Sequence, residues 1–215
     1  MDAFERPVER VLQRLNTKEA LSNWAVGCDK DIGGYSSASL DLTPEGTAKF
    51  HGTLSMRLPR QRKHIVRSGY AAMRCKGARP TLFGDVFWDT TPFRFLLLRV
   101  RGDHRRYMVN LQTDGVIETD LFQHRLFLRR PGEWEDVLIA FRDFTQTNNG
   151  LILPDQMQML RERVRTVGVS LADGQEGSFQ LEIDHIKMIN TEDTDGDVDV
   201  HPALNQPRDP FVHHT

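Results

Sequence analysis

Cysteine, histidine and clustered acidic residues, the residue types that most often carry chemistry, are present but are not spaced as a reactive set. The two cysteines, Cys28 and Cys75, form no Cys-X-X-Cys pair, and the eight histidines are scattered. Structural zinc sites use four ligands, usually with short local spacings. A reactive thiol needs a neighbourhood that lowers its pKa, and no adjacent sequence feature implies one. We therefore expect two small buried thiols and no zinc site.

Residues 193–199, Asp-Thr-Asp-Gly-Asp-Val-Asp, resemble the start of a calcium-binding loop. Such a loop requires glycine at its sixth position and a bidentate glutamate at its twelfth. Here glycine is fourth, as Gly196, and Leu204 is twelfth. The run is therefore interpreted as a solvated acidic segment. The sequence also contains no Gly-X-Ser-X-Gly elbow, phosphate-binding loop or dinucleotide fingerprint, so we predict no enzyme, cofactor or metal.

Several basic residues could form a positive surface for phosphates, anionic lipid or an acidic partner, although a merely solvated charge run is the simpler interpretation. The formal net charge of -2 gives no global bias toward nucleic acid. Arg101-Gly102-Asp103 matches an adhesion tripeptide, but a turn accounts for the glycine and the aspartate. The candidate partner-binding residues are Arg60, Arg62, Lys63, Arg67, Arg101 and Arg105.

The three tryptophans, Trp24, Trp88 and Trp134, could stack on sugar rings. Large aromatic side chains more often supply buried area in a core or at a sheet edge. Nothing in the local sequence separates these two interpretations. A carbohydrate-binding module therefore remains an alternative function.

The 215 residues and 39% hydrophobic content are sufficient for one sizeable domain. Two cysteines and no Asn-X-Ser/Thr acceptor favour a reducing compartment over secretion. The longest apolar runs fall far short of the roughly 20 residues that span a bilayer. Acidic residues interrupt the N-terminal arginines, so we identify no targeting segment, and the residues leave the localisation open.

Two runs of strand-forming residues joined by a short glycine turn must pair antiparallel, because a parallel return needs a long crossover, and this predicts an antiparallel β protein. The run Phe95–Val100 and the alternating residues Tyr107–Gln112 flank Gly102, and we expect them to form a hairpin. Helical spacing predicts an amphipathic helix over 4–16, and Pro154 followed by Met157, Leu160 and Val164 predicts a short helical insert. Other strands are expected at 38–42, 48–56, 68–74, 121–128, 137–141, 167–171 and 179–189, the last with a bulge near Asp184-His185.

The segments together resemble the complex I intermediate-associated protein 30 family. The resemblance is spread over residues 22–190, with pieces that are individually weak but occur in the right order. They include Ile32-Gly33-Gly34-Tyr35-Ser36, Phe50-His51-Gly52-Thr53-Leu54-Ser55, Ser68-Gly69-Tyr70-Ala71-Ala72-Met73-Arg74, Leu98-Arg99-Val100-Arg101-Gly102-Asp103, Gly132-Glu133-Trp134, Val167-Gly168-Val169-Ser170 and Gly177-Ser178-Phe179-Gln180-Leu181-Glu182-Ile183.

The resemblance implies an all-β fold, a galactose-binding-like antiparallel β-sandwich or jelly roll over 22–190. A helical extension over 1–21 and an acidic, proline-rich tail over 191–215 would flank it. It further implies a non-enzymatic assembly factor, without cofactor, that binds a membrane-arm intermediate of mitochondrial complex I. The expected companions are other assembly factors, either a helical-repeat protein or an acyl-CoA-dehydrogenase-like one. The expected location is the mitochondrial matrix, peripheral to the inner membrane.

Overall fold

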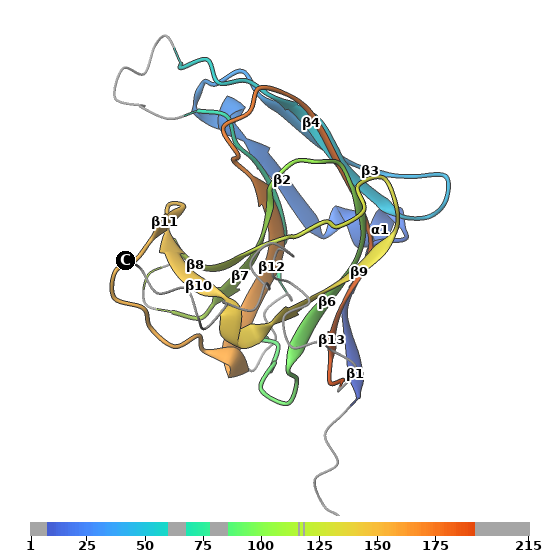
Figure 1. Cartoon of the computed structure of the whole chain (residues 1–215), viewed down its shortest axis with the longest axis vertical. Coiled ribbons are helices and arrows are strands. Elements are labelled where there is room, and N and C mark those ends of the chain that lie inside the picture. Colours follow the sequence, from blue (N-terminus) through green and yellow to red (C-terminus); the bar gives the residue numbers. More distant parts are fainter. Residues whose placement is uncertain (1–7, 60–67, 78–85, 116, 118, 192–215) are drawn as a thin grey trace, which may run out of the picture.

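The computed structural model describes residues 8–59, 68–77, 86–115, 117 and 119–191. Within these residues two antiparallel sheets pack face to face (Figure 1). The predicted β-sandwich is therefore confirmed. All the strand pairings of the described chain are antiparallel, as expected for sheets that present one face to a core and one to solvent.

The first sheet has six strands in the order β3-β4-β13-β6-β9, with β1 also paired to β13. The strands are β1 (Glu9–Arg14), β3 (Ser37–Leu42), β4 (Ala48–Leu54), β6 (Phe95–Gly102), β9 (Glu135–Ala140) and β13 (Gly177–Ile189). Strand β13 is long enough to pair with β4 along its first half and with β1 along its second.

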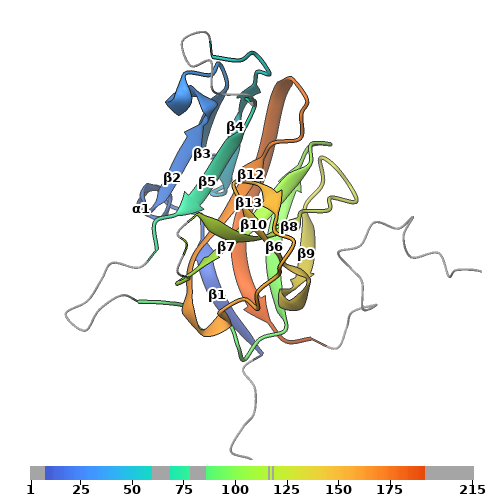
Figure 2. The ribbon, with the colours of Figure 1, turned by 90° about the vertical axis from the view of Figure 1, so that its left-hand side faces the viewer.

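The second sheet has seven strands in the order β11-β10-β8-β7-β12-β5-β2 (Figure 2). They are β2 (Trp24–Cys28), β5 (Ala71–Cys75), β7 (Tyr107–Thr113), β8 (Asp120–Arg125), β10 (Thr145–Asn148), β11 (Leu151–Ile152) and β12 (Val164–Leu171). The helical elements are short: α1 (Lys18–Ser22) and 3₁₀ turns at Asp29–Ile32, Phe141–Asp143 and Arg161–Arg163.

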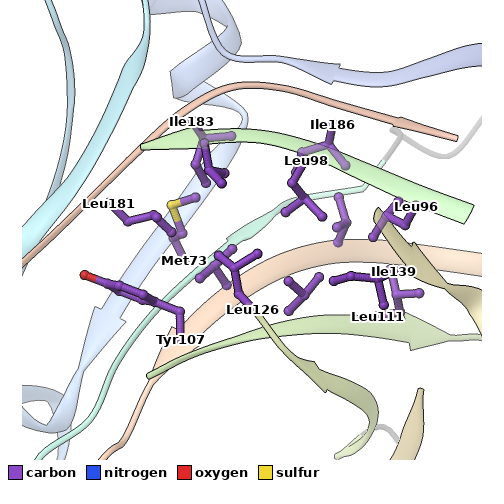
Figure 3. Close-up of a cluster of buried hydrophobic side chains, with 14 of the residues drawn as sticks. Met73, Leu96, Leu98, Tyr107, Leu111, Leu126, Ile139, Leu181, Ile183 and Ile186 are labelled. Carbon is purple, nitrogen blue, oxygen red and sulfur yellow. The ribbon is translucent and has the colours of Figure 1, made fainter. Parts of the chain in front are cut away.

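The core lies between the two sheets and is built by strict alternation along the strands. Figure 3 shows side chains from both sheets meeting in one apolar layer. Fully buried members are Met73, Leu96, Leu98, Tyr107, Leu111, Leu126, Ile139, Leu181, Ile183 and Ile186. Full burial of one such aliphatic side chain contributes about 1.5–3 kcal/mol.

The predicted hairpin between Phe95–Val100 and Tyr107–Gln112 is wrong. Strand β6 belongs to the six-stranded sheet and β7 to the seven-stranded sheet, so the connection after Gly102 carries the chain across the sandwich. Asp103 organises this connection, since its Oδ1 accepts from the Arg105 N–H at 2.9 Å and its Oδ2 from the Gln180 N–H at 2.7 Å. Asp103 lies in this connection, but Gly102 is the last residue of β6 and pairs with Leu181, so the interpretation of Gly102 as a hairpin-turn residue is wrong.

The predicted amphipathic helix over 4–16 is wrong where the structure describes it, because residues 9–14 form β1. A register shift between Val11 and Gln13 changes the phase of the strand. Leu12 and Leu15 consequently point into the core, whereas Val8 is 73% exposed. A bulged strand has therefore produced apolar spacings that imitate a helical period. The expected extension over 1–21 contributes a strand to the sandwich.

The predicted helical insert after Pro154 is also wrong, since helix is confined to the turn Arg161–Arg163 and Val164 already begins β12. The side chains of Gln146 and Gln156 replace helical hydrogen bonds: Gln156 Oε1 accepts from the Gln146 N–H at 2.7 Å, and Gln146 Oε1 accepts from the Met157 N–H at 2.9 Å. In contrast, the bulge predicted in β13 is confirmed by a register shift between Ile183 and His185.

Candidate interaction surfaces

The predicted basic contacts divide into two groups. Arg60, Arg62, Lys63 and Arg67 lie outside the described residues. Arg101 and Arg105 are described, and the structure gives them different environments.

Arg105 is committed to the fold. Its Nε and Nη2 donate to the two carboxylate oxygens of Asp173 at 2.8 and 2.9 Å, and Nη2 also donates to the Gln175 carbonyl at 2.6 Å. The Arg105 side chain is 9% exposed and the Asp173 side chain is 0% exposed. Burial disfavours the charged form of Asp173, but the hydrogen bonds from Arg105 and the Gln175 N–H outweigh it and hold the Asp173 pKa below its ordinary 3.8.

Arg101 lies on the outer face of the six-stranded sheet. Its Nη2 donates to Glu182 at 2.7 Å, and its guanidinium lies 5.0 Å from the Trp134 ring centroid. Other cross-strand ion pairs on this face join Arg99 to Asp136 at 3.4 Å and Lys187 to Glu9 at 3.2 Å. Paired, partly exposed charges of this kind contribute about 0.2–1 kcal/mol each and are typical of a solvated face.

Asp29 is a fully buried carboxylate that joins three segments of chain. It accepts from the Ser36 N–H at 2.8 Å, from the Ser36 hydroxyl at 2.9 Å, and from the Ser68 hydroxyl and the Gly69 N–H at 2.6 Å each. Burial opposes its ionisation, but these hydrogen bonds outweigh that cost and lower the pKa of Asp29. Asp29 thereby fixes the chain where it enters β5.

The lowered pKa values of Asp29 and Asp173 predict a specific acid sensitivity. A carboxyl whose folded-state pKa lies below its unfolded value stabilises the protein above the unfolded value, and this contribution is lost as the pH falls through the folded value. Near neutral pH, the free energy of unfolding should not change with pH on account of these two groups. It should decrease once the pH falls below 3.8, the ordinary pKa of an aspartate carboxyl. Urea titrations at several pH values would measure this.

The matched control for the acid sensitivity is Asp29→Asn. This variant should be less stable at neutral pH, and its stability should decline less steeply in acid than that of the wild-type chain. Parallel stability curves for the two proteins would contradict the assignment to Asp29.

The outer face of the seven-stranded sheet is hollowed. β8, β10 and β11 curve away from β12 and β2 in Figure 1, and a trough of about 300 Å³ lies over β2, β5, β12 and β7. Its floor is made by small residues: Ala25 and Gly27 of β2, Ala72 of β5 and Gly168 of β12. Gly168 allows no larger residue, because a Cβ there would lie 2.5 Å from the Met73 carbonyl oxygen.

Uncharged polar side chains link neighbouring strands beside the trough. Asn110 donates to the Ser170 hydroxyl at 3.0 Å, Gln123 donates to Asn110 Oδ1 at 2.6 Å, and Thr147 donates to Gln123 Oε1 at 2.9 Å. This chain of hydrogen bonds crosses β12, β7, β8 and β10 and holds the amides in fixed orientations. This surface was not predicted from the sequence: alternation marks these positions as outward-facing, but it does not give the strand order that brings them together.

The remaining predicted residues lie in different surroundings. Trp24 is 5% exposed and belongs to the core, which excludes it as a sugar-stacking platform. Trp134 lies beside Arg99 and Arg101 of the six-stranded sheet. Trp88 forms an isolated antiparallel β-bridge with Val164. Cys28 and Cys75 are free and buried, as predicted. Burial is the largest influence on Cys75 and raises its pKa, which favours the unreactive thiol.

Two further properties concern the described residues alone. They contain no helix both long and apolar enough to cross a membrane. They also contain no group of three or more His, Cys, Asp or Glu side chains suited to hold a metal ion.

The fold places the chain among β-sandwich proteins with the architecture of carbohydrate-binding modules. A family 11 carbohydrate-binding module from Clostridium thermocellum, solved with a β-1,3-1,4-mixed-linked tetrasaccharide, superposes with a TM-score of 0.54 over 86% of this chain and 96% of the module, at 14% identity. An agarase superposes with a TM-score of 0.54 over 86% of this chain and 25% of the enzyme, at 9% identity. Identities this low show a shared fold alone.

The sequence comparisons identify the family. Residues 13–183 match the model of the complex I intermediate-associated protein 30 (CIA30) family, and the chain belongs to this family. It is 36% identical to the mitochondrial complex I intermediate-associated protein 30 of Neurospora crassa, covering 90% of this chain and 78% of that protein. The mouse protein of the same name is 34% identical, over 82% of this chain and 55% of its own length. The chain thus spans little more than half of the mouse relative.

Proposed function

We propose that this protein is a non-catalytic assembly factor that binds a membrane-arm intermediate of mitochondrial complex I, on the matrix side and peripheral to the inner membrane. The observation that carries the proposal is the family match over residues 13–183, which includes almost the whole sandwich. The relatives named for complex I intermediates are called mitochondrial. The buried carboxylate and the buried ion pair described above stabilise the fold, as expected of a rigid protein that binds a partner on its surface.

The test is whether the full chain, tagged and expressed in mitochondria, co-migrates on native gels with a partial complex I that lacks its peripheral arm. We expect co-migration with this partial complex and not with the finished enzyme. Migration only as free protein, or only with the finished enzyme, would contradict the proposal.

The basic residues predicted from the sequence form a separate arm of this test. Replacing Arg60, Arg62 and Lys63 with alanine should weaken co-migration while leaving the thermal midpoint unchanged. Wild-type co-migration of the triple variant would remove these residues from the contact surface and leave the assembly role intact.

The alternative of a carbohydrate-binding module is less well supported. The shared architecture does not determine a ligand. Trp24 is in the core, and the ring of Trp134 has guanidinium groups of Arg99 and Arg101 at 5.8 and 5.0 Å.

A further inference from the structure

The two outer faces of the sandwich differ in the charge that their central strands carry. The six-stranded sheet carries cross-strand ion pairs such as Arg101–Glu182 and Arg99–Asp136. The seven-stranded sheet carries amides, hydroxyls and small residues over its central strands. Its ion pairs, of Asp114 with Arg163 and Arg165, lie at one end of β7 and β12. The central regions of protein interfaces are depleted in charged residues, whereas surfaces that remain in water are not. The seven-stranded sheet thus has the composition of a docking face.

Arg74 is the one long cationic side chain among the residues that line the trough. Its strand neighbours in register are Ala25 of β2 and Gly168 of β12, so no large side chain stands beside it. It is exposed, and no ion pair involves it in the described part of the chain. A guanidinium in this position can bind a carboxylate through two parallel hydrogen bonds.

Asp31 supplies the opposite charge in the same trough. Its Oδ2 lies 3.2 Å from the position that a Cβ on Gly27 would occupy. Gly27 pairs with Ala72, and Arg74 pairs with Ala25, so the acid and the base are separated by two residues along the strands. That offset is about 7 Å, the distance between side chains on one face of an extended chain.

We infer that the trough binds an extended polypeptide segment of the assembly intermediate, one that presents an acidic side chain to Arg74 and a basic side chain two positions away to Asp31. This inference rests on the proposed function and adds the surface and the chemistry of the partner. Charge complementarity identifies the segment and sets its direction. The small residues of the floor let its backbone approach, and the fixed amides of Asn110 and its neighbours supply donors and acceptors for that backbone.

Copurification of the partial complex I with the tagged full chain tests the inference by charge and by shape. Arg74→Glu should reduce the recovered intermediate about tenfold or more, the effect of a central interface residue, while Arg74→Lys should retain part of the binding. Ala72→Trp fills the trough without touching the core and should reduce recovery similarly. Each variant should keep the wild-type thermal midpoint within a few degrees, since both side chains face outward.

Matched changes on the opposite sheet are the controls. Arg99→Glu reverses a charge and Thr53→Trp adds the same bulk on the outer face of the six-stranded sheet, and both should recover the intermediate within about twofold of wild type. If the wild-type chain recovers the intermediate and both trough variants do so equally well, the trough assignment is wrong and the assembly role stands. If the wild-type chain recovers none, the proposed function fails and the inference fails with it.

A glycan titration addresses the other class of occupant. Soluble mixed-linked β-glucan should not bind the wild-type chain. If the glucan binds, and Ala72→Trp abolishes this binding while Thr53→Trp preserves it, the trough binds a saccharide. The inference that it binds a polypeptide segment would then be wrong.

Discussion

Replacing Arg105 with alanine should lower the free energy of unfolding by about 3–5 kcal/mol, because it leaves the Asp173 carboxylate buried without its ion-pair partner. The side chain of Asp173 is fully buried, and both of its carboxylate oxygens accept from Arg105. The same change removes the donor to the Gln175 carbonyl. Urea denaturation followed by circular dichroism would measure the loss.

Arg106→Ala is the matched control, since Arg106 is exposed and donates to the Asp173 backbone carbonyl at 2.8 Å. Its cost should stay below about 1 kcal/mol, the usual range for one exposed hydrogen bond. The double variant Arg105→Ala/Asp173→Ala should lose less than the sum of the two single variants, because the two side chains interact directly. Strict additivity would show that the pair is not coupled.

The second large effect is expected at Asp29. Asp29→Ala removes the acceptor for four hydrogen bonds and leaves the Ser36 and Gly69 N–H groups buried without partners. Each buried donor left unsatisfied costs about 1–3 kcal/mol, so a total loss of about 3–5 kcal/mol is expected. Thermal and urea unfolding of the purified variant would test this value.

Asp31→Asn provides the comparison, because Asp31 belongs to the same 3₁₀ turn but is exposed. Its stability should remain within about 0.5 kcal/mol of wild type. If Asp29→Ala lowers the free energy of unfolding as little as Asp31→Asn does, water replaces the Asp29 carboxylate without an energetic cost.

The fold class could be predicted from the sequence because alternation along strands such as β4 reports directly which residues are buried. Strand partners could not be predicted in the same way. Leu98 of β6 and Val109 of β7 both face the core, whether the two strands pair with each other or lie in opposite sheets. A glycine turn between two alternating runs is compatible with both arrangements, and packing across the sandwich decides between them.

The environments of the candidate contact residues were harder to predict for the same reason. Arg105 has the sequence appearance of a surface cation, and only the tertiary position of Asp173 shows that it is an internal ion pair. Arg74 has the same sequence appearance, but Ala25 and Gly168 beside it leave it accessible. The sequence shows which residues are charged. Whether such a residue is paired or accessible depends on neighbours from segments far apart in the chain.

The central position of β13 has a consequence for the order in which the molecule can fold. This strand ends at Ile189 and pairs with β4 along its first half, with β1 along its second half, and with β6 from Leu181 onward. A chain synthesised from its N-terminus therefore cannot complete the six-stranded sheet until almost all the described residues have emerged. Long-range pairings of this kind fold slowly and leave strand edges exposed to aggregation meanwhile. We expect the nascent chain to depend on general folding helpers until β13 has emerged.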